Sequence, residues 1–226
     1  MQKKLSLIFG WRTVIFFILL ELFTVPPVAM SNSIVIQNIW YMAIMGFVVA
    51  LICVYFLLRL LKNTIIKNSL RIVGTQLFDI NGIWYIAVLA GILLMIMFVV
   101  QDLLFSYKFG DFSTGFISAF ISVGGTLVLY KLLSYSGISI RLMANSQQYQ
   151  LEFEWLDILK LAVLFGLYEF IVCPITGLWI PYPEHRFSLA VVSGIIGGGA
   201  GGLLVSMLSC FVKLLQANVW LNSIES

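Results

Sequence analysis

The twenty residues from Leu161 to Ile180 read LAVLFGLYEFIVCPITGLWI, with one charged side chain among them, Glu169. About 20 apolar residues are needed to cross the hydrocarbon core of a bilayer as an α-helix, so this run predicts a membrane-spanning helix. A charged group at the centre of a span costs roughly 2.5–3.5 kcal/mol on insertion scales, and it usually marks a functional pathway or a buried contact.

The rest of the 226-residue chain has the same character. Hydrophobic residues make up 61% and charged residues 10% of it, whereas a soluble domain carries about 25% charged residues. The sequence therefore predicts an all-α polytopic membrane protein with one transmembrane domain over residues 1–226. Six segments are long and apolar enough to span: 13–30, 39–61, 83–105, 115–133, 161–180 and 189–215.

The first of these segments is the least regular. Glu21 and the pair Pro26-Pro27 interrupt its apolar run, and proline disrupts the helical hydrogen-bond ladder. A five-span protein with a re-entrant first segment is therefore the alternative to six spans.

Positive charge is distributed unevenly between the two sides of the predicted membrane. With the N-terminus inside, the outer regions hold Lys108 and Arg186, and the inner regions hold the other eleven of the 13 lysines and arginines. Cytoplasmic segments carry this excess in membrane proteins. We therefore expect both termini in the cytoplasm and the chain in an inner (plasma) membrane of bacterial type.

Two longer loops lie on the predicted inner side, at 62–82 and 134–160. Within the first, apolar residues recur at helical spacing from Ile66 to Leu77, with Lys67 and Arg71 on another face. This pattern predicts a basic amphipathic helix over 63–78 on the cytoplasmic membrane surface.

The second loop has the alternating pattern of strands. A turn over 145–148 would pair Leu142 with Leu151, Ile140 with Phe153, and Arg141 with Glu152. An isolated hairpin is marginally stable in water, so we expect it to rest on the membrane, to pair between subunits or to dock a soluble partner. Extension of the flanking helices is the alternative. The predicted docking residues are Ile140, Arg141, Glu152, Phe153 and Trp155.

Each intramembrane glutamate is followed five residues later by a proline, Glu21 by Pro26 and Glu169 by Pro174. Proline has no N–H to donate to the carbonyl four residues earlier, which frees the carbonyl groups of Leu22 and Phe170. A carboxyl beside an unpaired carbonyl in a kinked helix predicts a site for a proton or a small cation.

Two other interpretations of the glutamates stay open. A buried carboxyl with no cation at its depth is expected to be neutral near pH 7. It would then serve as a packing contact, hydrogen-bonded to a group such as the hydroxyl of Ser118, Ser122, Thr126 or Tyr168. Recognition of a signal or ligand is the third possibility.

The last predicted span carries small residues in two rows. Gly194, Gly198, Gly202 and Ser206 recur every four residues, and Ser193, Gly197 and Gly201 form a parallel row. Small residues at this spacing let helix backbones approach closely. This pattern predicts helix packing and a homo-oligomer built on the first row.

The sequence offers no site for enzymatic chemistry. It lacks the nucleophile-elbow, phosphate-loop and paired-histidine metalloprotease motifs, and its one histidine, His185, does not make a metal site. We expect a non-enzymatic protein without cofactor or nucleic-acid partner: a small transporter or channel subunit that handles a proton or cation. The alternative is an oligomeric sensor or scaffold that recruits a soluble cytoplasmic effector, as in bacterial signalling or phage-defence assemblies.

Overall fold

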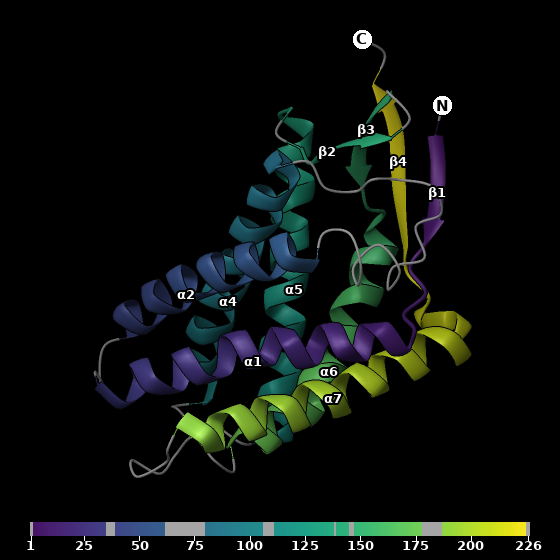
Figure 1. Cartoon of the computed structure of the whole chain (residues 1–226). Coiled ribbons are helices and arrows are strands. Elements are labelled where there is room, and N and C mark those ends of the chain that lie inside the picture. The colour runs from purple at the N-terminus through teal and green to yellow at the C-terminus, as the bar shows by residue number, and fades with distance from the viewer. Residues whose placement is uncertain are drawn as a thin grey trace.

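The computed structural model of the chain describes residues 2–34, 39–61, 80–105, 111–137, 139–144, 147–177 and 187–224. Within these residues it contains helices and one small antiparallel sheet (Figure 1). The helices are α1 (Trp11–Ile34), α2 (Ile39–Leu61), α4 (Ile80–Phe105), α5 (Phe112–Tyr135), α6 (Trp155–Gly177), α7 (Phe187–Phe211) and the 3-10 helix η1 (Lys213–Leu215). The strands are β1 (Gln2–Ser6), β2 (Arg141–Ala144), β3 (Gln147–Glu152) and β4 (Asn218–Ile224).

Three of the helices are long and apolar enough to cross a membrane: α5, α6 and the Ser188–Phe211 part of α7. Shorter apolar stretches lie in α2 (Ala43–Phe56) and α4 (Ala87–Met97). The chain therefore has the features of an integral membrane protein. The six-span count, the direction of insertion and the kind of membrane stay predictions, and the amphipathic helix expected over 63–78 lies outside the described residues.

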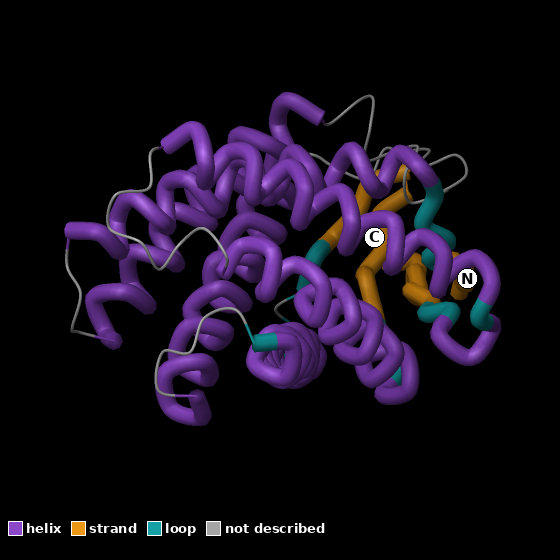
Figure 2. Tube along the Cα trace, turned by 90° about the horizontal axis from the view of Figure 1, so that it is seen from below, coloured by secondary structure: helices purple, strands orange, loops and turns teal. Residues whose placement is uncertain are grey.

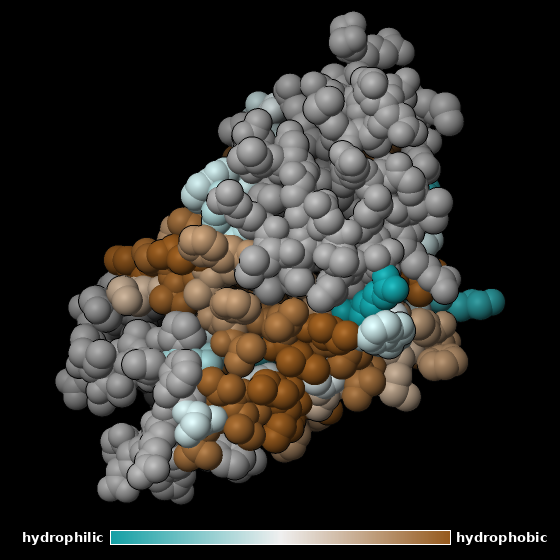
Figure 3. All heavy atoms as spheres, in the orientation of Figure 1, coloured by the Kyte–Doolittle hydropathy of each residue, from teal (hydrophilic) through white to brown (hydrophobic). Residues whose placement is uncertain are grey.

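Apolar side chains also cover the outside of the helices. On α2, Ile44, Val48, Ile52 and Phe56 recur every four residues and are all exposed. Figure 3 shows hydrophobic side chains gathered over the helices on one face of the molecule. An exposed apolar stripe of this length is what a lipid-facing helix needs.

The first predicted segment forms one continuous helix. α1 runs through Pro26 and Pro27 to Ile34 without a break among the described residues, so the two prolines do not end it. α1 and α7 lie side by side and cross α5 and α6 (Figures 1 and 2). α6 packs against both α5 and α7, and α2 packs mainly against α4.

The sheet corrects the all-α expectation. Its four strands are antiparallel in the order β1-β4-β3-β2. β4 pairs with β1 on one side, with Lys4 opposite Trp220, and with β3 on the other, with Leu151 opposite Leu221. β1 and β4 were not predicted, because each is short and its partner is about two hundred residues away along the chain.

The hairpin exists, but its predicted register is wrong by two residues. Leu142 lies opposite Tyr149 and Arg141 opposite Gln150, so Arg141 does not face Glu152, which instead pairs with Trp220 of β4. The strands are joined by two residues rather than four, the commonest length of a hairpin connection. A shift of two residues keeps every side chain on its predicted face.

Both ends of the described chain and the hairpin meet in this sheet, at the same side of the helices (Figure 1). β1 leads into α1, β2 follows α5, β3 leads into α6, and β4 follows α7. These four helix ends therefore lie on one side of the molecule, whichever side of a membrane that is.

Candidate functional site

The buried carboxyl of Glu21 lies where α1, α6 and α7 come together. The Tyr168 hydroxyl of α6 donates a hydrogen bond to Glu21 Oε1 at 2.6 Å. Both residues are buried, with 7% of Glu21 and 2% of Tyr168 exposed. A carboxyl from one helix is thus joined to a phenol from another at their packed faces.

The first row of small residues on α7 makes this approach possible. A Cβ added at Gly198 would lie 2.6 Å from the carbonyl oxygen of Phe17 and 2.9 Å from Cγ of Glu21. At Gly194 it would lie 3.0 Å from the carbonyl oxygen of Glu21, and at Gly202 3.0 Å from Cα of Val14. Any side chain at Gly198 would push α1 away, so this glycine fixes the position of Glu21.

The second row plays the same part toward α6. A Cβ at Gly201 would lie 2.5 Å from the Tyr168 ring, and one at Gly197 would lie 3.3 Å from Val172. The two rows of α7 therefore hold α1 and α6 at distances that let Glu21 and Tyr168 meet. The Ser206 hydroxyl completes the first row by donating to the carbonyl oxygen of Gly10 at 3.0 Å.

These contacts account for the face of Gly194, Gly198, Gly202 and Ser206 within the chain. Because α1 already covers that face, a homo-oligomer would have to use another surface. Oligomerisation itself stays a prediction.

Aromatic rings enclose the Glu21–Tyr168 pair. Phe17 lies one helical turn before Glu21, and its ring centroid is 4.6 Å from that of Tyr168 and 5.7 Å from that of Phe165. Leu164 and Val172 beside them are almost fully buried. In an apolar enclosure of this kind, electrostatic interactions are much stronger than in water.

Glu169 follows Tyr168 on α6 and is half-buried. That Glu169 and Glu21 act as one site stays a prediction. α5 packs closely on this turn of α6, since a Cβ at Gly115 would overlap the carbonyl oxygen of Glu169.

The other residues predicted for the site are less central. Pro26 is fully buried, while Pro174 and Leu22 are half-buried. Phe170 is 40% exposed, and its ring lies 4.9 Å from that of Phe112 on α5. The part proposed for the carbonyl groups of Leu22 and Phe170 stays a prediction.

Of the hydroxyl groups suggested as partners of a neutral glutamate, Tyr168 is the one that contacts Glu21. The hydroxyls of Ser118 and Ser122 donate to carbonyl oxygens three residues earlier in α5, those of Gly115 and Ala119. The hydroxyl of Thr126 is buried, with no hydrogen-bond partner among the described residues.

Two of the predicted docking residues, Ile140 and Phe153, contact Tyr130 of α5. Ile140 is buried, and its N–H donates to the hydroxyl of Tyr130 at 3.2 Å. Phe153 packs edge-on against the Tyr130 ring, and its carbonyl accepts a hydrogen bond from Lys131. Trp155 is 55% exposed at the start of α6, so a partner could contact it.

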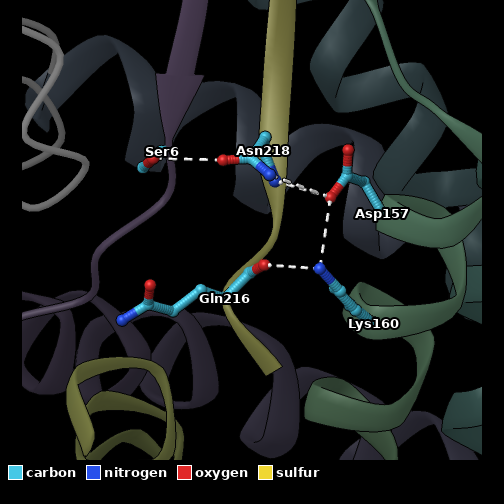
Figure 4. A network of polar contacts seen from close by, with 5 residues as sticks. All are labelled: Ser6, Asp157, Lys160, Gln216 and Asn218. Atoms are coloured by element: carbon cyan, nitrogen blue, oxygen red, sulfur yellow. Dashed lines mark hydrogen bonds and ion pairs between the residues drawn. The ribbon is translucent and has the colours of Figure 1, made fainter. Parts of the chain in front are cut away.

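A polar network ties the sheet to the helices (Figure 4). Asp157 in the first turn of α6 is buried and accepts hydrogen bonds from the backbone and side-chain nitrogens of Asn218 at 3.0 and 3.3 Å. Lys160 lies 4.0 Å from Asp157 and donates to the carbonyl oxygen of Gln216. Sequence reasoning missed this site, although an acidic residue in the first turn of a helix is a usable signal.

Comparison with protein families, curated proteins and solved structures finds no match to this chain. The candidate site is therefore defined by its own geometry: a carboxyl and a phenol in hydrogen-bond contact inside the helices.

Proposed function

We propose that the chain is a non-enzymatic inner-membrane protein, a small transporter or channel subunit in which Glu21 takes up and releases a proton. The observation that carries this proposal is the buried Glu21–Tyr168 hydrogen bond at the junction of α1, α6 and α7. Among the described residues the ion pair found is that of Lys160 with Asp157, so a cationic side chain does not neutralise Glu21 there.

A proton suits this site because a second carboxyl, that of Glu169, belongs to the residue next to Tyr168 in α6. Carboxylates that interact in a buried space are unfavourable when both are ionised. Gain of a proton by Glu21 or Glu169 therefore changes the electrostatic energy of the other. A phenol can donate to a carboxylate or accept from a carboxylic acid, so Tyr168 can accompany either state of Glu21 without repacking.

A small metal cation suits the site less well. Calcium takes about six to eight oxygen ligands, and magnesium needs near-octahedral coordination. The described contact joins the Glu21 carboxyl to one phenol, that of Tyr168, and proton exchange needs no more than such a pair. This supports the proton reading of the sequence-based prediction.

The proposed orientation has both termini in the cytoplasm. β1, β4 and the hairpin belong to one sheet, so these segments share a side, as an even number of spans requires. The positive-inside rule then assigns that side to the cytoplasm.

Proton flux in liposomes tests the proposal. The purified full chain is reconstituted with a pH-sensitive dye inside, and a potassium diffusion potential drives proton entry. We expect Glu21→Gln to abolish the flux and Tyr168→Phe to reduce it. Glu154→Gln is the matched control, because Glu154 is an exposed carboxylate on the sheet side. Flux in Glu21→Gln equal to that of the unmodified protein would contradict the proposal.

A second candidate function, that of a sensor or scaffold holding a soluble effector, is favoured by the sheet. β1 and β2 are its edge strands, and an edge strand can accept a further strand from a partner. A pull-down in mild detergent tests this candidate. A stoichiometric soluble protein that is lost in Trp155→Ala would support the scaffold, whereas a homo-oligomer alone would favour transport.

A further inference from the structure

Large apolar side chains project from the helix ends on the sheet side. These ends belong to α1, α5, α6 and α7, each of which adjoins a strand or η1. The residues there are between 55% and 80% exposed. We call this set the collar; it consists of Trp11, Tyr135, Trp155, Leu156, Phe211 and Leu214.

The collar continues an apolar stripe that runs along the outside of α7. Leu203, Met207 and Phe211 recur every four residues and are 53%, 58% and 80% exposed. Residues at this spacing share one helix face. The stripe therefore leads from the outer surface of the helices to the collar, and the stripe and the collar form one exposed surface.

Cationic side chains lie beside residues of the collar. The Arg12 guanidinium lies 5.7 Å from the ring centroid of Trp11, and Lys131 Nζ lies 5.0 Å from that of Trp155. Lys213 is exposed between Phe211 and Leu214. Glu154 is the exposed acid next to Trp155, on the α6 side of the collar.

Arg12 lies at the beginning of α1 and Lys213 just after the end of α7, and hydrogen bonds join these two segments. The backbone of Phe9, just before α1, accepts a hydrogen bond from Cys210 Sγ, and its N–H donates to the Ser209 hydroxyl, at 3.0 and 3.2 Å. The beginning of α1 and the end of α7 thus present both basic residues from one part of the surface.

We propose that the collar lies at the lipid–water boundary and that Arg12 and Lys213 bind the headgroups of anionic phospholipids. Tryptophan and tyrosine concentrate at this depth in membrane proteins because their rings are amphipathic. Basic residues next to the membrane are attracted to anionic headgroups. A lipid boundary explains why the exposed apolar residues come from four separate helices and continue into the α7 stripe. The inference does not depend on proton transport.

Lipid selectivity of the reconstituted full chain tests the proposal. The fraction of spin-labelled phosphatidylglycerol that the protein immobilises is compared with that of spin-labelled phosphatidylcholine. We expect the unmodified protein to prefer phosphatidylglycerol. In the variants Arg12→Gln and Lys213→Gln, and in the double variant, this preference should fall by about fivefold for each charge removed. Lys4→Gln is the matched control, because Lys4 is an exposed cation on β1. Equal immobilisation of the two lipids, or an equal loss in Lys4→Gln, would overturn the proposal.

A second measurement tests the depth of the collar independently of charge. Lipids brominated near the headgroup end of their chains quench tryptophan fluorescence on contact. Replacing Trp11 and Trp155 together by phenylalanine should reduce the quenchable emission, whereas replacing Trp220 in β4 should leave it unchanged. The reverse pattern would place the sheet rather than the collar in the lipid and would overturn the assignment.

Discussion

Replacement of Gly198 by alanine tests the packing that creates the Glu21 site. The added Cβ would lie 2.6 Å from the carbonyl oxygen of Phe17 and 2.9 Å from Cα of Ile18. Both are backbone atoms, so the contact can be relieved only by moving α1 away from α7. Overpacking of this kind costs about 1–3 kcal/mol.

Gly199→Ala is the matched control. A Cβ at Gly199 would meet only the side chain of Ile18, at 3.5 Å, which is an ordinary contact. The same substitution at the next position of the same helix carries about the same gain in helix propensity, about 1 kcal/mol in water. That gain cancels when the two variants are compared, so the expected difference in unfolding free energy is the overpacking cost of about 1–3 kcal/mol.

The assay is unfolding of the purified protein in mixed micelles by increasing amounts of sodium dodecyl sulfate, followed by circular dichroism. We expect Gly198→Ala to unfold at a lower detergent fraction than Gly199→Ala. Equal midpoints, or a more stable Gly198→Ala, would show that α1 does not lie against Gly198. Sedimentation should give the same number of subunits for both variants, because α1 of the same chain covers this face.

Two further predictions concern the attachment of the sheet. Tyr130→Phe removes the hydroxyl that donates to the carbonyl oxygen of Leu151 at 2.7 Å and accepts from the N–H of Ile140. We expect the strands β2 and β3 to lose about 1–3 kcal/mol of stability, measured as faster amide hydrogen exchange. Unchanged exchange in these strands would contradict the prediction. Asp157→Ala leaves the N–H of Asn218 without its acceptor and should lower the stability of the β4 attachment by about 1–3 kcal/mol, measured as faster proteolytic release of β4. Asp157→Asn keeps an acceptor and should lose less stability. Equal rates of release in the two variants would argue against the hydrogen bond.

Much of the helical part of the fold can be predicted from the sequence, because long apolar runs have few alternatives. The glycine spacing on α7 also predicts close helix packing, and the structure adds which helix each row contacts. That Glu21 and Glu169 act together is a prediction from their similar depth in two spans. The choice of Tyr168 as the partner of Glu21 does not follow from that depth, because it depends on how α1 and α6 are rotated about α7.

The sheet is the part that local sequence patterns predict least. The alternation around Leu142 and Leu151 indicates a hairpin, but its register depends on the turn length, which residues 145–148 leave open. β1 and β4 carry weak local signals, and their pairing joins residues as far apart as Gln2 and Asn222. Contacts at that separation arise from the arrangement of all the intervening helices.

The position of β4 in the sheet has a consequence for how the protein is made. β4 follows every described helix in the chain, yet it lies between β1 and β3. During synthesis β1 and the hairpin therefore have unpaired edges until β4 has been made. If α7 were inserted the wrong way round, β4 would be delivered to the opposite compartment, and two unpaired edges, which favour aggregation, would remain.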